Sequence, residues 1–195
     1  MPLLHIINAK LKKSITENAK FAALEKATNM SNISVVNATV SGFSEQSIGV
    51  GVWLNNTDDL ETFAASEEHL VFIMQGLAPI IDSLWSAAID CSDLLPRENN
   101  DFLFWLYAFP DHEGVFEWEI QKMLNDISLL PGESWDGITI EERDRFRAGG
   151  IVIINKSEYE IFSKKLEDCK SAWKDRVESL TEEFYQNNTY MTVRS

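Results

Sequence analysis

The chain has 195 residues, of which 45% are hydrophobic and 11% aromatic, a composition typical of a folded core and unlike that of a disordered chain. Its 31 acidic and 17 basic residues give a net charge of −14, which repels phosphate groups, so we expect neither nucleic acid nor an anionic membrane as a partner. Because no apolar stretch is long enough to span a bilayer and the N-terminus reaches charge too early for a signal peptide, we expect a cytoplasmic protein.

The first part of the chain alternates between strand and helix patterns. Residues 3–11 (LLHIINAKL) are apolar on both faces, which is typical of a strand covered on two sides. Residues 15–30 carry apolar side chains at helical spacing. Residues 33–40 and 48–54 then predict two strands joined by a turn around residues 42–46. We therefore expect a strand, a helix and a hairpin.

Residues 57–90 predict two consecutive helices and a further strand. Thr57 can cap the first helix, and Ser66 can cap a second helix whose first turn holds two glutamates, where carboxylates suit the helix dipole. We expect a break near Ser66 and a strand over residues 84–89. The order strand, helix, strand, strand, helix, strand is the ferredoxin-like pattern, and it fills residues 1–91.

The second part of the chain begins a similar cycle. Residues 92–101 are polar and are interpreted as a linker. Residues 102–109 (FLFWLYAF) predict a very apolar strand, and residues 115–130 predict an amphipathic helix. Residues 130–150 stay unassigned, because only residues 137–140 resemble a strand.

The later part of the chain repeats a pattern found in the first unit. The stretches VGVWLNNTDDLE and IVIINKSEYE share the order strand, Asn, capping hydroxyl and acidic turn at an offset of about 100 residues. The fold prediction is therefore α+β, with two tandem ferredoxin-like βαββαβ units, residues 1–91 and 102–195, forming an intrachain pseudo-dimeric α/β barrel. Each sheet can cover the other, so a monomer is sufficient, although a homodimer is possible.

Common cofactor and metal motifs are missing. The sequence has no P-loop, GxGxxG, HExxH or GxSxG motif and no zinc-type Cys/His cluster, so we expect no cofactor and no metal. The Gly49-Val50-Gly51 segment is too short to cradle a phosphate, and its glycines are interpreted as positions where a neighbour lies close to a strand.

Three histidines are the remaining candidates for chemistry. His112 follows a proline in a turn and is interpreted as solvated, while His5 lies in a buried strand, where a hydrogen-bonded core histidine is the alternative to a catalytic one. His69 is the third helical residue after Ser66. A helix N-terminus disfavours an added positive charge, so its imidazole tends to stay neutral and can act as a general base. The alternative is an ordinary first-turn residue.

The stretches HIINAKLKKSITENAK and SEEHLVF resemble the dimeric α/β-barrel family, which includes olivetolic acid cyclase, stress-responsive barrel proteins and the antibiotic-biosynthesis monooxygenases of secondary metabolism. The resemblance covers the first unit in register and the second only in outline. It implies a catalytic histidine at His69 and a second histidine at His5. The cyclase pattern has a tyrosine where this chain has Phe63 and a histidine where it has Ile48, so the same cyclisation is not implied.

The second unit has no histidine near the position equivalent to His69, where Asp168 and Cys169 fall, so we place the function in the first unit. Its pocket is expected between sheet and helices, and an apolar lining suits a flat phenolic or polyketide-like molecule. Plain core packing is the alternative for each lining residue. The predicted lining consists of Ile7, Val50, Phe63, Phe72, Ile73, and Trp53 or Trp85, depending on which face of the sheet each strand residue takes.

The resulting hypothesis is a cofactor-independent enzyme in which His69 abstracts a proton from an apolar phenolic or enolisable small molecule while His5 holds or relays a proton. A cyclase, lyase or monooxygenase outcome stays open. The alternative is a non-catalytic barrel that binds an apolar ligand or serves as a stress-related interaction protein. The missing hydroxyl at Phe63 and the missing histidine in the second unit favour that alternative.

Overall fold

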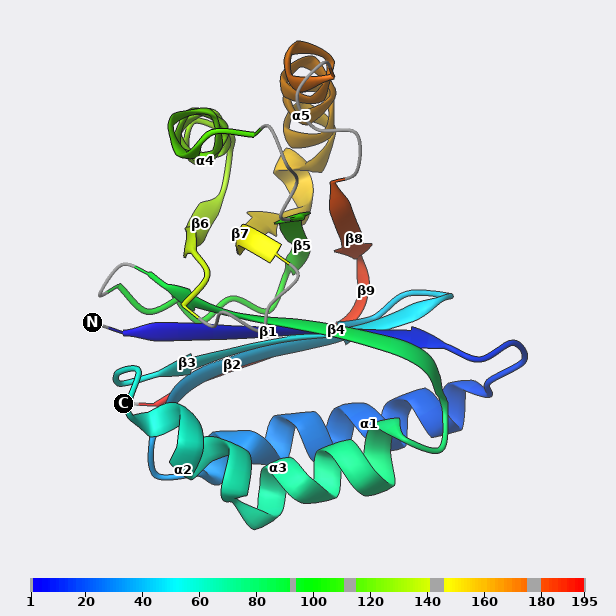
Figure 1. Ribbon diagram of the computed structural model, residues 1–195. Helices are drawn as coiled ribbons and strands as arrows, with labels where there is room; N and C mark the ends of the chain where they lie inside the picture. Colours follow the sequence, from blue (N-terminus) through cyan, green and yellow to red (C-terminus); the bar gives the residue numbers. More distant parts are fainter. Residues whose placement is uncertain (1, 92–93, 111–114, 141–145, 175–179, 195) are drawn as a thin grey trace.

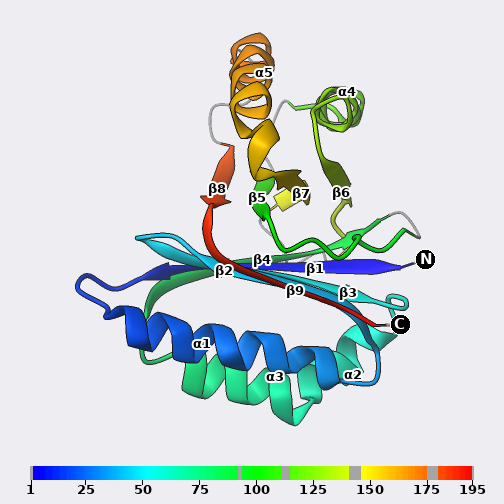
Figure 2. The ribbon, with the colours of Figure 1, turned by 180° about the vertical axis from the view of Figure 1, so that it is seen from behind.

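The computed structural model describes residues 2–91, 94–110, 115–140, 146–174 and 180–194. Over these ranges the chain forms two antiparallel sheets that pack face to face, and each sheet carries helices on its outer side (Figures 1 and 2).

The first unit contains the expected strands and helices in the expected order. The helix break at Ser66 is confirmed, because α2 ends at Ala65 and α3 begins at Glu67. The last strand begins at Ile81, three residues earlier than expected. The elements are β1 (Leu3–Leu11), α1 (Glu17–Asn29), the 3₁₀ turn η1 (Met30–Asn32), β2 (Val36–Phe43), β3 (Ser47–Leu54), α2 (Asp59–Ala65), α3 (Glu67–Val71), the π-helical segment η2 (Phe72–Leu77) and β4 (Ile81–Asp90).

The second unit repeats this order at an offset of about 100 residues. The stretch that the sequence left unassigned contains a strand that begins at Glu133. Residues 94–100, within the expected linker, form neither helix nor strand, and residues 92–93 lie outside the described ranges. The elements are β5 (Phe102–Pro110), α4 (Glu117–Ser128), β6 (Glu133–Ile138), β7 (Phe146–Asn155), the 3₁₀ turn η3 (Lys156–Glu158), α5 (Tyr159–Trp173), β8 (Thr181–Tyr185) and β9 (Asn187–Val193).

Both sheets have the ferredoxin-like strand order. The first sheet runs β4-β1-β3-β2-β9 and the second runs β6-β7-β5-β8, so the four strands of each unit occupy equivalent places. The registers match as well, since Leu3 pairs with Leu54 and Leu103 pairs with Ile154, each 100 residues further along. The predicted fold of two tandem ferredoxin-like units is thus confirmed.

Strand β9 departs from the expected arrangement. Its residues belong to the predicted second unit, 102–195, but in that unit the strand equivalent to β4 is β8, which pairs with β5. Instead, β9 pairs with β2 of the first sheet, where Val40 lies opposite Met191. Hydrophobic alternation predicts which residues of a strand face the core but not which sheet the strand joins. The division of the chain into domains of residues 1–91 and 102–195 therefore stays a prediction. Strand β9 comes from the second of these ranges but lies in the sheet of the first.

The two sheets are connected along both edges. On one side β8 leads through Gln186 into β9, so one length of chain passes from the second sheet to the first (Figure 2). On the other side Ile89 of β4 forms a β-bridge with Thr139, and the backbone N–H of Ile140 donates to the carbonyl of Ala88 at 2.9 Å. These connections make the two sheets an intrachain pseudo-dimeric barrel.

Each sheet is apolar on both faces, as the sequence predicted for the first strand. One core cluster lies between the first sheet and α1 to α3, a second lies between the two sheets, and a third lies beneath α4 and α5. Within β1 the odd-numbered residues face the helices, including Leu3, Ile7 and Ala9. The even-numbered Leu4 and Ile6 face the other sheet. Figure 1 shows the helices and sheets in these layers.

The helix start at Thr57 is wrong in detail. The residue that precedes α2 is Asp58, and no side chain caps this helix; Thr57 contributes its carbonyl, which accepts from the N–H of Leu60 at 3.1 Å. The Asn56 side chain accepts from the N–H of Asp58 instead, which closes a local turn before the helix.

Among the described residues, no helix combines the length and apolar character needed to cross a membrane.

Candidate functional site

The break between α2 and α3 places His69. Ser66 is extended at the break, and its hydroxyl both donates to the carbonyl of Phe63 at 2.7 Å and accepts from the backbone N–H of His69 at 3.3 Å. This is the N-cap arrangement that the sequence predicted for Ser66. Ser66 ends one helix and starts the next, so the first turn of α3 contacts the last turn of α2.

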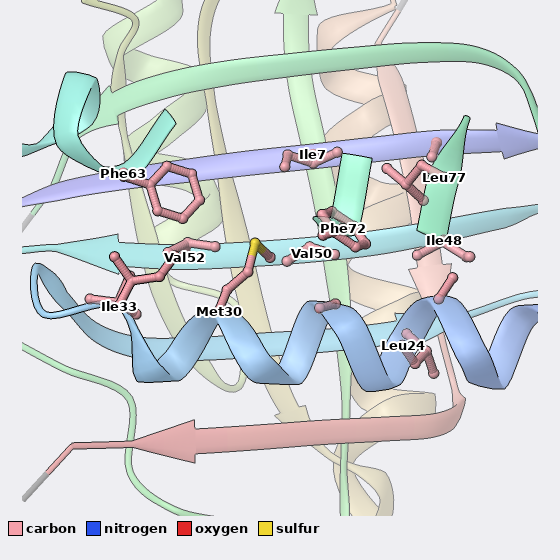
Figure 3. Packing of buried hydrophobic residues seen from close by; sticks show 14 of the residues in the cluster. Ile7, Leu24, Met30, Ile33, Ile48, Val50, Val52, Phe63, Phe72 and Leu77 are labelled. Atoms are coloured by element: carbon pink, nitrogen blue, oxygen red, sulfur yellow. The ribbon is translucent and has the colours of Figure 1, made fainter. Parts of the chain in front are cut away.

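His5, Phe63 and His69 form one cluster on the helix side of the first sheet. The Phe63 ring contacts both imidazoles, with its centroid 4.6 Å from the His69 ring and 5.8 Å from the His5 ring. Phe63 is fully buried, whereas both histidines are half-buried. Figure 3 shows the Phe63 side chain directed from α2 toward the sheet. The two predicted catalytic histidines are therefore brought together around the position where the cyclase pattern has a tyrosine.

Hydrogen bonding defines which ring nitrogen of His69 is available to accept a proton. Its Nδ1 lies 3.1 Å from the carbonyl oxygen of Ala64, so the neutral ring that donates there carries its proton on Nδ1. The other nitrogen, Nε2, then keeps its lone pair. Burial lowers the pKa of His69, and the Ala64 carbonyl acts in the opposite direction. At neutral pH the imidazole is thus an uncharged base.

His5 is held neutral more strongly than His69. Burial lowers the pKa of His5 to about 4, the nearby charge of a protonated His69 lowers it further, and the Ala87 backbone opposes both effects. Its Nδ1 is buried and has no hydrogen-bond partner among the described residues. A buried nitrogen without a partner is costly in a folded protein, and such groups often belong to sites that act on a ligand.

Replacing His5 by Gln is expected to reduce the acid sensitivity of the protein. The unfolded chain binds a proton to His5 near pH 6.5, but the folded chain does so only near pH 4. The wild type therefore loses stability as the pH falls through this interval. Urea unfolding at pH 7.0 and 4.5 should show that the loss is smaller in the variant by roughly 2 kcal/mol. Equal losses in both proteins would contradict the neutral, buried state of His5.

The other residues expected around the substrate divide between the two faces of the first sheet. Trp53 and Trp85 point to the opposite face, where Trp53 meets Trp135 and Trp85 meets Phe146. The expected single lining is thus split by the alternation of side chains along each strand. The residues that share the helix side with His5 and His69 are Ile7, Val50, Phe72 and Ile73.

The helix that carries His69 continues into the π-helical segment η2, which the sequence did not predict. Phe72 and Leu77 of this segment are buried against the sheet, as Figure 3 shows, while Met74 is 65% exposed. Its single glycine, Gly76, packs beside Ala23 of α1. Short π-helical segments inside α-helices are frequently found at functional sites.

The equivalent face of the second unit is filled by aromatic side chains. At an offset of 100 residues, Trp105 replaces His5 and Cys169 replaces His69. The Trp105 ring stacks on Tyr107 at 4.3 Å, and its Nε1 donates to Glu182 at 2.8 Å. His112, the third histidine, lies outside the described residues.

A second titratable pair, which the sequence did not reveal, lies in the second unit. Tyr107 and Asp136 both lie opposite Gly150 of β7, and the missing side chain of this glycine leaves room for the phenol and the carboxyl-bearing side chain beside each other. Burial raises the pKa of Asp136 to about 6 and raises that of Tyr107 above its usual value. Asp136 falls in the stretch that the sequence left unassigned, and no motif distinguishes it there.

No protein-family model and no curated protein matches the sequence. Solved structures match over nearly the full chain. A candidate monooxygenase from Fusobacterium nucleatum is 15% identical and has a TM-score of 0.64, with 100% of this chain and 98% of that chain covered. An anthrone oxidase-like protein is 14% identical with a TM-score of 0.65, covering 97% and 93%. A candidate monooxygenase from Lactobacillus acidophilus is 12% identical with a TM-score of 0.61, covering 98% and 99%.

At these identities the similarity is one of fold. The chain is therefore a tandem ferredoxin-like α/β barrel of the same full-length architecture as these proteins. The first unit holds two histidines with lowered pKa values, and both contact Phe63.

Proposed function

We propose that this protein is a cofactor-independent oxygenase in which His69 removes a proton from an apolar phenolic or enolisable molecule. The observation that carries the proposal is the His5–Phe63–His69 cluster, in which both imidazoles have lowered pKa values and Nε2 of His69 is left as the acceptor of a proton. Such a base increases the rate of proton transfer because it is correctly positioned and because it is uncharged at neutral pH.

The reaction is written for an anthrone-type substrate. His69 Nε2 takes a proton from the methylene carbon, and the electron pair of the broken C–H bond is delocalised as an enolate. The enolate reacts with O2, a C–O bond forms, and the resulting peroxide takes the proton back. Loss of water then leaves a quinone carbonyl, so one oxygen atom of O2 enters the product and the other leaves as water.

His5 and Phe63 have supporting roles in this proposal. The buried Phe63 ring packs against both imidazoles and holds them in place, and His5 holds or relays a proton. The π-helical segment η2 follows directly after the turn that carries His69, and the exposed side chain of Met74 lies close in sequence to the base. The names of the neighbouring structures, two candidate monooxygenases and an anthrone oxidase-like protein, support an oxygenase outcome over cyclisation.

An oxygen-consumption assay with anthrone tests the reaction. The purified protein is expected to consume one O2 for each quinone formed, without an added metal or organic cofactor. The quinone is followed by its absorbance and O2 by an electrode. A rate no faster than that in buffer alone would count against the proposal for this substrate class.

The pH dependence of the rate follows from the lowered pKa of His69. Only the neutral imidazole can accept a proton, so the rate should rise with pH and level off, with a midpoint below the ordinary value of 6.5. The pKa measured by NMR titration of the His69 ring should agree with that midpoint. A ring that titrates at or above 6.5 contradicts the assignment.

A non-catalytic ligand-binding barrel is the second candidate, and one observation favours it. The fully buried Phe63 ring contacts both imidazoles and carries no hydroxyl to stabilise an enolate. In that case an apolar ligand would bind on the helix side without turnover. Binding of anthrone without O2 consumption would support this alternative.

A further inference from the structure

A polar cavity lies between the two sheets, on the opposite face of the first sheet from His5. Its volume is about 290 Å³, near the lower limit for sites that hold small ligands. Trp85 is the one apolar side chain in its wall. The cavity is lined by Asn8, Lys10, Gln46, Ser47, Ser83, Trp85, Thr181, Glu182 and Glu183.

The floor of the cavity consists of two rows of side chains across β4, β1 and β3. The first row contains Ser83, Lys10 and Ser47, which lie opposite one another in the sheet. The second row contains Trp85 and Asn8 and ends at Gly49. Strand β8 of the second sheet forms the facing wall. The site therefore exists only because the two units of one chain face each other.

A buried tyrosine fixes the polar side chains of the floor. The ring of Tyr185 lies over Gly49, where a Cβ atom would come within 2.3 Å of it, and stacks on Phe104 at 4.6 Å. Its hydroxyl accepts from Asn8 Nδ2 at 2.7 Å. Asn8 is only 7% exposed, so this hydrogen bond defines the direction of its amide. An oriented, nearly buried amide in a cavity wall is typical of a specific binding site.

The cavity wall contains three charged residues, Lys10, Glu182 and Glu183. Within the described part of the chain, neither Lys10 nor Glu183 makes a side-chain hydrogen bond or an ion pair. Glu182 is different, because Lys170 and Trp105 already hold its two carboxylate oxygens. Lys10 is thus available for an anionic group and Glu183 for a cationic one.

We propose that this cavity binds a small aromatic zwitterion of the α-amino-acid type. The carboxylate pairs with Lys10, the ammonium pairs with Glu183, and the flat side chain lies against Trp85. Asn8 and Ser83 supply hydrogen bonds to the polar end. The site is separate from the proposed oxygenase site, since the first sheet lies between them.

A ligand series on the wild-type protein tests the proposal. The indole signal of Trp85, assigned with Trp85→Phe, is followed in ¹H–¹⁵N NMR spectra during titration with L-phenylalanine, 3-phenylpropionate and phenethylamine. We expect L-phenylalanine to bind roughly fivefold more tightly than either analogue, because each analogue lacks one ion pair. No shift of Trp85 up to the solubility limit, or equal affinities for all three molecules, would overturn the proposal.

Two variants assign the charges. Lys10→Met is expected to weaken L-phenylalanine and 3-phenylpropionate roughly fivefold and to leave phenethylamine unchanged, and Glu183→Gln should give the converse pattern. Lys13→Met is the matched control, because this exposed lysine lies outside the cavity. An equal loss of affinity in Lys13→Met would show that only the overall charge of the protein matters, which would refute the site. The ligand series on the wild type decides the question even if a variant fails to fold.

The test is independent of the oxygenase proposal. His69→Ala should leave the binding of L-phenylalanine unchanged, because His69 lies on the helix side of the first sheet. Ser83→Tyr, at an exposed position on the rim, should fill the cavity and abolish binding while anthrone oxidation continues. Loss of both properties in either variant would contradict two separate sites.

Discussion

His69→Ala is expected to lower the rate of anthrone oxidation by roughly 100-fold or more, because general bases contribute about 10²- to 10⁴-fold to proton transfer. The substitution removes Nε2, the proton acceptor, but keeps the backbone N–H that Ser66 caps, so α3 should still form. Initial rates under air, measured as quinone absorbance, give the ratio directly. The loss should appear in kcat, since the base acts on the reacting bond.

Two comparisons separate chemistry from structure in this experiment. Leu70→Ala changes the next residue of the same helix, which is exposed, and should keep nearly full activity. His5→Gln should lower the rate less than His69→Ala does, because His5 is proposed only to hold or relay a proton. If His69→Ala keeps wild-type activity, the base lies elsewhere and the oxygenase proposal fails at its central residue.

Gly49→Ala is expected to destabilise the fold by roughly 3 kcal/mol, the upper end of what overpacking costs in a core. The added Cβ would lie 2.3 Å from two ring carbons of Tyr185, and β3 cannot move away because β1 and β2 pair with it on both sides. Urea unfolding at pH 7 measures the change in the free energy of unfolding.

A matched glycine and a double variant test the cause of that loss. At Gly76 an added Cβ would lie 3.4 Å or more from its neighbours, so Gly76→Ala should be neutral or stabilising by up to about 1 kcal/mol. In a Tyr185→Ala background the ring is absent, and Gly49→Ala should then cost little. A full loss in that background would show that the tyrosine ring is not what Gly49 accommodates.

Local patterns of the sequence predicted most of the secondary structure. The cap at Ser66 could be read because a serine before two glutamates has a direct physical meaning at a helix start, and the His69 turn depends on it. The shared face of His5 and Ile7 followed from the twofold period of a strand. No local pattern predicts that His5 and His69 lie near each other. That expectation came from the resemblance to a known family.

Features that depend on contacts between distant segments could not be predicted from the sequence. Trp53 and Trp85 were expected beside His69, but only the registers of β3 and β4 decide that they face the second sheet. The Tyr107–Asp136 pair depends on the missing side chain of Gly150, which lies between them in the sheet. The cavity between the sheets needs both units in place, so no single stretch of sequence contains its signal.

The pairing of β9 with β2 has a consequence for the order in which the chain folds. Because β2 finds this neighbour about 150 residues later in the sequence, its outer edge stays unpaired during synthesis until residues 187–193 have left the ribosome. An open strand edge is a template for pairing with other chains. Completion of the first sheet is also a contact of very long range, which slows folding. Residues 187–193 therefore complete a sheet whose other four strands end by Asp90, and the nascent chain depends on this segment for protection against aggregation.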